Sequence, residues 1–178
     1  SGGGQDETSK AAVLLERILR NQSTEGWFKE YEGADPGYQS LCTYYLADVH
    51  LNRKDFNLLD PLRQSIQFLW HFAHPDGSFG SGSTFKNNVA ITALCGMAFL
   101  GDGNTPGRGK YGVQVQKAVD FILASCKPSG YIISPDSISH GPMYGHGFAT
   151  LFLAEVYGMT RSKDVRVKLE KAVELIVK

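Results

Sequence analysis

The chain has 178 residues, of which 42% are hydrophobic, and it carries 18 basic and 18 acidic side chains. This length is typical of one domain, and the composition is sufficient for a hydrophobic core. Balanced charge provides no field that would attract nucleic acid, and no apolar run reaches the roughly 18 residues that a membrane-spanning helix needs. We therefore expect one domain that binds no nucleic acid and has no integral membrane segment.

Residues 1–9 are predicted to form a flexible leader, because they are rich in glycine and polar side chains. Thr8 or Ser9 is a plausible N-cap for the first helix. The segment could be a tether left after removal of a signal segment, as in lipid-anchored exported bacterial proteins, although it contains no hydrophobic signal region. A bacterial protein, either cytoplasmic or exported, is expected. Residues 10–178 are predicted to form one repeat domain.

One sequence pattern occurs three times along this domain. An amphipathic stretch ends in a turn of the type Ser-Thr-Glu-Gly, His-Pro-Asp-Gly or Lys-Pro-Ser-Gly, and the glycines Gly26, Gly77 and Gly130 are 51 and 53 residues apart. A period of this size indicates a repeat architecture. Glycine accepts the positive φ that such a reversal needs. Aromatic residues just after the glycines are expected to pack on the helix that precedes them: Trp27, Phe79 and Tyr131.

Each turn is followed by a second helix that is more apolar than the first. These second helices are predicted over 38–49, 89–100 and 148–157. The middle one is apolar on nearly all sides, so we expect it to be buried on both faces and to be the most buried segment. The amphipathic helices keep a charged face, and a fourth such helix is predicted over 165–178. About seven helices should therefore form two layers, with the charged helices outside and the apolar helices inside.

The predicted fold class is all-α, an α/α toroid-like array of helical hairpins. The repeats span about 10–57, 58–110 and 111–160, and a fourth begins over 161–178. Three and a half repeats form only a partial ring, which would leave apolar faces uncovered at Leu14 and Ile18 and at Val173 and Ile176. We therefore expect either self-association or a natural protein with a further C-terminal half.

Three cysteines lie in apolar helical contexts, at Cys42, Cys95 and Cys126. Three cysteines cannot all pair within the chain, so reduced and buried thiols are expected. The sequence contains no Cys-x-x-Cys pair and no His-rich pattern. We therefore expect no metal site and no cofactor.

The repeated pattern resembles a known family. An apolar helix, a glutamine, a turn, a glycine and an aromatic residue, clearest over 22–27, are similar to the QW-type repeat of the prenyltransferase and squalene–hopene cyclase superfamily. The segment 76–178, with 104–111 and 140–158, resembles uncharacterised bacterial repeat proteins. The resemblance implies an α/α toroid around an apolar cavity that would take a lipid or isoprenoid-like ligand. Fold resemblance alone carries no particular chemistry.

The chain departs from the catalytic patterns of that superfamily. It contains no Asp-x-Asp-Asp, the acid motif of the cyclases, and no cysteine is preceded two residues earlier by aspartate, as in the zinc site of the protein prenyltransferases. The glutamine of the repeat is replaced by Ala73 and Cys126. Whether the domain is an enzyme therefore stays open.

Two loops carry the residues that could form a site. His140-Gly-Pro-Met-Tyr-Gly-His146 precedes the third inner helix, and Glu30-Tyr-Glu-Gly-Ala-Asp-Pro-Gly-Tyr38 precedes the first. In a toroid both loops would open at one rim. The candidate catalytic and ligand-binding residues are Asp35, Tyr38, His140, Tyr144 and His146. Imidazole moves protons near neutrality, and a phenol donates to developing charge.

A purely structural role for the same residues is an equally available interpretation. Asp35 would cap a helix that has proline at its first position, His146 would cap another helix, and His140 would bond a loop carbonyl. Three functions stay open for the chain: a terpenoid-binding or prenyl-binding toroid, a non-catalytic protein-binding scaffold, and a carbohydrate-active, lyase-like toroid that uses the His and Tyr rim.

Overall fold

The structure is a computed structural model that describes residues 3–81, 85–135 and 141–178, except for the side chains of residues 3–9 and of Pro142. This part of the chain forms seven α-helices and only isolated β-bridges. The helices are α1 (Gly3–Arg20), α2 (Pro36–Asn52), α3 (Leu59–Trp70), α4 (Val89–Gly101), α5 (Gly112–Ala124), α6 (Pro142–Thr160) and α7 (Lys163–Val177). The all-α prediction is confirmed.

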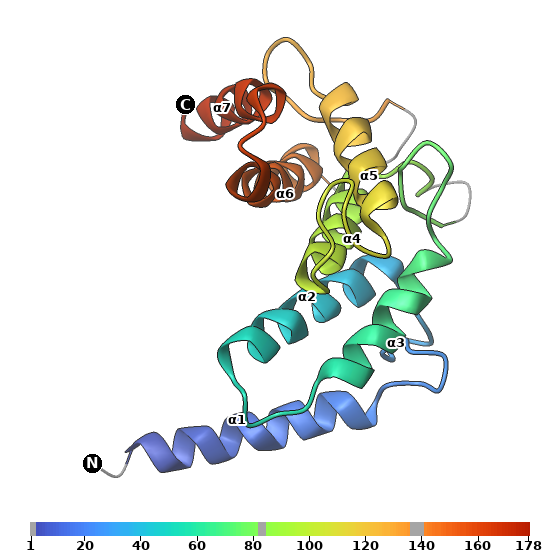
Figure 1. Cartoon of the computed structure of the whole chain (residues 1–178), viewed down its shortest axis with the longest axis vertical. Helices are drawn as coiled ribbons and strands as arrows, with labels where there is room; N and C mark the ends of the chain where they lie inside the picture. Colours follow the sequence, from blue (N-terminus) through green and yellow to red (C-terminus); the bar gives the residue numbers. More distant parts are fainter. Residues whose placement is uncertain (1–2, 82–84, 136–140) are drawn as a thin grey trace.

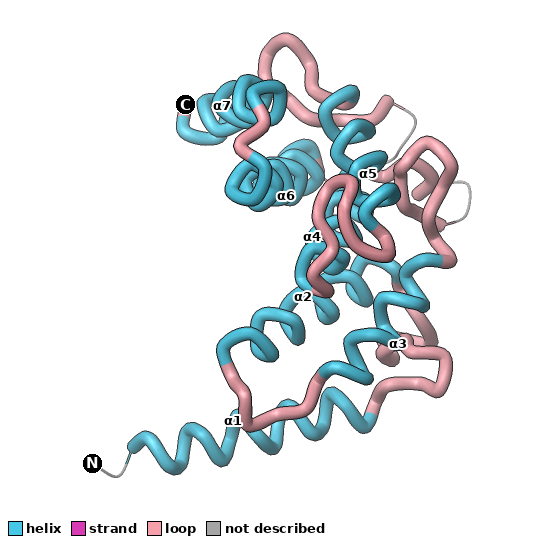
Figure 2. The backbone as a smooth tube through the Cα atoms, in the orientation of Figure 1, coloured by secondary structure: helices cyan, strands magenta, loops and turns pink. Residues whose placement is uncertain are grey.

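The helices pack in two layers along a curve (Figure 1). The inner layer consists of α2, α4 and α6, with α4 packed between the other two. On the outer side, α3 packs on α2, α5 on α4 and α7 on α6. Leu15 of α1 joins a separate small core with Leu46 of α2 and Leu62 of α3. Figure 2 shows that, outside the helices, the described residues form loops and turns.

The central helix α4 is the most buried element, as its sequence predicts. Of its 13 residues, 11 are buried, against six of the 13 in α5. Close packing against α6 depends on Gly96, because a Cβ there would lie 2.5 Å from the Phe152 ring. No ordinary side-chain contact is that short, so a larger residue at this position of α4 would displace the Phe152 ring.

The three glycine turns share one geometry, which confirms the prediction of positive φ. The φ angles of Gly26, Gly77 and Gly130 are +96°, +91° and +92°. In each turn a Cβ would lie 2.2 to 2.3 Å from a backbone oxygen of the following outer helix. The turns therefore pack against the next outer helix, on α3, α5 and α7 respectively.

We expected Trp27, Phe79 and Tyr131 to pack in the same way on their preceding helices. This prediction is wrong for Trp27 and Tyr131, because in these two turns the next residue has that position. The residues that bridge back to the end of the preceding helix are Phe28, Phe79 and Ile132, and all three are buried. Each follows its glycine by two positions. One residue more or less changes the face on which an extended side chain lies, so Trp27 and Tyr131 do not have the position of Phe79.

Two helices begin earlier than their patterns indicate. Helix α1 starts at Gly3, within the predicted leader. Helix α6 starts at Pro142, within the predicted Gly-rich loop. Proline at the first helical position has a fitting fixed φ and needs no N–H partner.

Apolar side chains remain exposed at both ends of the array, as expected. Leu14 and Ile18 of α1 are exposed, as are Val173 and Ile176 of α7. The three cysteines are free thiols. Among the described helices, none has the length and apolar character required to cross a membrane.

Candidate functional site

Three buried polar side chains on the inner helices hold the glycine turns in place. Gln39 Oε1 accepts a hydrogen bond from the backbone N–H of Phe28 at 2.7 Å, and Thr92 Oγ1 accepts one from Phe79 at 2.9 Å. His146 Nδ1 accepts one from Ile132 at 3.2 Å. These three acceptors are 53 and 54 residues apart, so His146 has the position in α6 that Gln39 has in α2.

The second ring nitrogen of His146 is also engaged. Because Nδ1 accepts, Nε2 carries the proton and donates to the carbonyl of Ala172 in α7 at 3.2 Å. Gln39 reaches the outer helix α3 in the same way, through Ser65 Oγ at 2.5 Å. Burial lowers the pKa of His146. The expectation that His146 belongs to an open rim is therefore wrong, because its ring is fully buried and joins a turn to α7.

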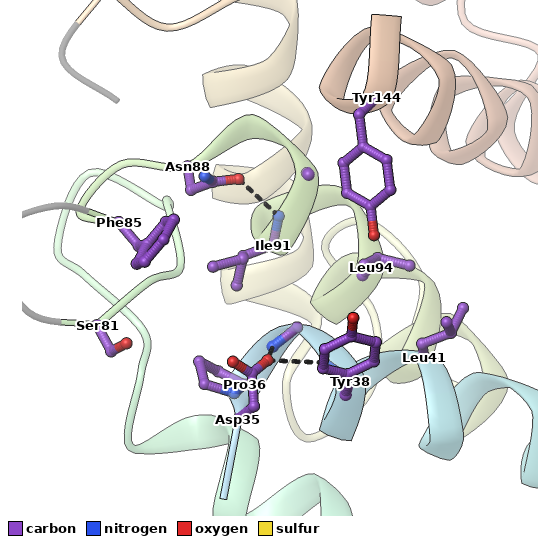
Figure 3. Close-up of a pocket in the computed structure, with 12 residues that line it drawn as sticks. Asp35, Pro36, Tyr38, Leu41, Ser81, Phe85, Asn88, Ile91, Leu94 and Tyr144 are labelled. Carbon is purple, nitrogen blue, oxygen red and sulfur yellow. Dashed lines mark hydrogen bonds between the residues drawn. The ribbon is translucent and has the colours of Figure 1, made fainter. Parts of the chain in front are cut away.

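A cavity of about 120 Å³ opens where α2, α4 and α6 begin (Figure 3). Its walls come from the first residues of all three inner helices and from the loop before α4. Apolar side chains of two helices line it at Leu41, Ile91 and Leu94, and Phe85 of the loop adds an aromatic ring. Since the starts of the three helices meet here, the inner helices run in the same direction.

Asp35 lies at one edge of this cavity and caps α2. Its Oδ1 accepts hydrogen bonds from the backbone N–H groups of Gly37 at 2.8 Å and Tyr38 at 3.0 Å. These bonds pair two of the N–H groups that a helix N-terminus leaves open. The capping interpretation is confirmed. Within the described lining, the carboxylate is also the sole ionisable acid or base apart from tyrosine.

Two tyrosines face each other across the cavity. Tyr38 projects from α2 and Tyr144 from α6, and Figure 3 shows their hydroxyl groups pointing toward one another beside Leu94. Their side chains are 46% and 49% exposed, so both phenols are open to a ligand. Tyr31 packs edge-on against Tyr38, with ring centroids 6.0 Å apart. A hydrogen bond with Tyr31 raises the pKa of Tyr38, which shifts ionisation of the phenol further from neutral pH.

The structure brings together three of the five predicted site residues. Asp35, Tyr38 and Tyr144 line one cavity, His146 lies behind it in the packed interior, and His140 lies outside the described residues. Sequence reasoning missed the apolar wall formed by Leu41, Ile91 and Leu94. The sequence does contain a signal for this wall. Ile91 and Leu94 are three residues apart, as are Tyr38 and Leu41, and this spacing places each pair on one face of its helix.

Comparison with known proteins gave no relative of this chain. No family model, no curated protein and no solved structure matches it. The site must therefore be interpreted from its own geometry.

The arrangement is suited to binding an amphipathic molecule. Among the described residues, the lining contains no lysine, arginine or histidine, and no group of three or more His, Cys, Asp or Glu side chains could bind a metal ion. Apolar side chains would contact a hydrocarbon, and two phenols can donate to or accept from one polar group.

Proposed function

We propose that the chain is a prenyltransferase-like and squalene cyclase-like helical repeat domain, with an α/α-toroid arrangement of its hairpins. In this proposal its inner face binds an uncharged isoprenoid-like molecule. The observation that supports it is the cavity at the start of the inner helices, where two opposed tyrosines lie beside an apolar wall. The hydrocarbon would contact Leu41, Ile91 and Leu94, and the polar end would lie between Tyr38 and Tyr144.

The charge of the lining favours a neutral ligand over an anionic one. A diphosphate requires cationic side chains to offset its charge, whereas the only charged side chain among the described lining residues is the carboxylate of Asp35. The N-termini of three helices contribute partial positive charge, but the carboxylate of Asp35 already caps the N-terminus of α2. An isoprenoid alcohol therefore suits the cavity better than its diphosphate.

Calorimetric titration with farnesol and with farnesyl diphosphate tests this proposal. The alcohol should bind, and the diphosphate should bind about tenfold more weakly or not at all. Tyr144→Ala should weaken the binding of farnesol about tenfold, because it removes an aromatic contact and a hydroxyl. Tyr45→Ala is the matched control, since Tyr45 is an exposed tyrosine of α2 that does not line the cavity.

Recognition of a neutral polyol is a second candidate function. It is favoured by the exposed tyrosines Tyr38 and Tyr144, which line the cavity together with one carboxylate. The exposed Tyr31 packs against Tyr38. Aromatic rings and a carboxylate oxygen are a common combination for sugar hydroxyl groups and ring faces. Binding of a neutral oligosaccharide that Tyr144→Ala abolishes, with no binding of farnesol, would favour this candidate over the first.

A further inference from the structure

A second cavity, of about 190 Å³, lies at the opposite end of the inner layer. It is lined by the last turns of α2, α4 and α6, whereas the cavity with the two tyrosines is lined by their first turns. The two cavities share no lining residue. They are therefore separate sites on one face.

The walls of this second cavity are largely apolar and include two thioethers. Met97 of α4 is fully buried, and Met159 of α6 is 49% exposed. Ala47, Leu51 and Leu100 add aliphatic side chains to the lining. Methionine side chains are polarisable and adapt to ligands of irregular shape, so these walls fit a small alkyl group.

All formal charge in the described lining of the second cavity is negative. Asp48 projects from α2 and Glu155 from α6, and none of the described lining residues is basic. No ion pair in the described part of the chain involves either carboxylate. The C-termini of three helices add partial negative charge at the same end.

A phenol lies close to both carboxylates. Tyr44 lines the cavity together with Asp48 and Glu155. Burial raises the pKa of Tyr44, and the neighbouring Glu155 and Asp48 raise it further. The ring of Tyr44 therefore offers an uncharged aromatic surface beside the two carboxylates.

From this geometry we infer that the second cavity binds a small organic cation with an alkyl body, such as an alkylammonium. The carboxylates on opposite walls would offset the charge of the cation, and the ring of Tyr44 would add a cation–π contact. The alkyl groups would contact Met97, Leu100 and Met159. A bare metal ion suits the cavity less well, because it would leave these apolar walls without a partner.

Methionine-methyl NMR tests this inference with a control inside the same spectrum. The chain has three methionines, of which Met97 and Met159 line the second cavity and Met143 lies at the start of α6. The probes are choline and its uncharged isostere 3,3-dimethylbutan-1-ol. Choline should shift the signals of Met97 and Met159 but not that of Met143, and the isostere should bind about tenfold more weakly.

Two variants identify the charges involved. Asp48→Asn and Glu155→Gln should each weaken choline binding about fivefold to tenfold. Glu174→Gln, at an exposed position of α7, should leave it unchanged. Circular dichroism checks that each variant is folded.

Several outcomes would overturn the inference. Choline and its isostere could bind equally well, or choline could shift the signals of all three methionines equally. Both carboxylate variants could bind choline as the parent does. Potassium or calcium chloride at matched ionic strength could produce the same shifts as choline. None of these outcomes bears on farnesol binding at the other cavity.

Discussion

The two faces of the inner layer use polar side chains in opposite ways. On the face packed against the turns and outer helices, Gln39, Thr92 and His146 are buried and hydrogen-bonded to backbone groups. On the open face, Tyr38 and Tyr144 project half-exposed into a cavity. The same helices thus carry structural and ligand-accessible polar groups side by side.

Tyr144 and His146 show the difference most sharply, because they lie two residues apart on α6. Successive residues of an α-helix are rotated by about 100°, so these side chains point about 200° apart. One faces the cavity and the other faces α7. The direction of a side chain from its helix decides which role it has, even where its residue type suits chemistry.

Substitution of a turn glycine should produce the largest effect on the packed face. Gly77→Val should lower the free energy of unfolding by about 3 kcal/mol or more, since it combines an unfavourable φ with a backbone clash. The Cβ at this position would lie 2.3 Å from the carbonyl oxygen of Lys117. Urea denaturation measures the change.

Gly103→Val is the matched control for this clash. Gly103 also has a positive φ, of +86°, but a Cβ there would meet nothing within 4 Å. Its cost should be about 1 kcal/mol, from the backbone conformation alone. Equal costs for the two variants would show that the turns are not packed on the outer helices.

Removal of the buried imidazole should have the next largest effect. His146→Ala should destabilise the fold by about 2 to 4 kcal/mol, because it leaves the N–H of Ile132 and the carbonyl of Ala172 without partners and opens a cavity. His146→Gln should recover part of this loss, since Gln39 makes the corresponding bonds in α2. Farnesol binding by His146→Gln should equal that of the parent, and a loss of binding without loss of stability would place His146 in the site.

The lowered pKa of His146 predicts a pH dependence of stability. The unfolded chain takes up a proton near pH 6.5, whereas the folded chain resists protonation at this ring. The stabilisation from neutral His146 is therefore complete above about pH 6.5 and is lost as the pH falls below it. Urea midpoints between pH 5 and pH 7.5 should fall more steeply for the parent than for His146→Gln. Parallel curves would contradict the burial of this ring.

Changes on the open face should have the smallest effect on stability. Tyr144→Ala should alter the free energy of unfolding by no more than about 0.5 kcal/mol, because the side chain is half-exposed. Thermal or urea denaturation measures this change, and binding is measured separately. A loss comparable to that of His146→Ala would mean that Tyr144 belongs to the core.

The sequence predicts much of the division between a packed face and an open face of the inner layer, but not all of it. The repeated glycine turns and the apolar run over 89–100 predict the two layers, because spacing and hydrophobicity report directly on turns and burial. The role of His146 does not follow, since its partners Ile132 and Ala172 are distant in sequence and a loop was expected where α6 begins. The spacing of Gln39, Thr92 and His146, at 53 and 54 residues, matches the repeat period and is the sequence signal for this structural role of His146.

The second cavity could not be predicted from the sequence either. Asp48 and Glu155 are 107 residues apart, and only the parallel packing of α2, α4 and α6 brings them to one cavity. Each carboxylate by itself has the sequence context of an ordinary charged residue on a helix. Tertiary packing creates this cavity, and no local sequence pattern indicates it.

Photocrosslinking with a diazirine-bearing isoprenoid alcohol tests the central claim most directly, because it reports where the ligand lies. The label, mapped by mass spectrometry, should be found on Tyr38, Leu41, Ile91, Leu94 or Tyr144, and excess farnesol should suppress it. Labelling that is confined to the outer helices α3, α5 and α7, or that farnesol does not suppress, would contradict a ligand-binding inner face.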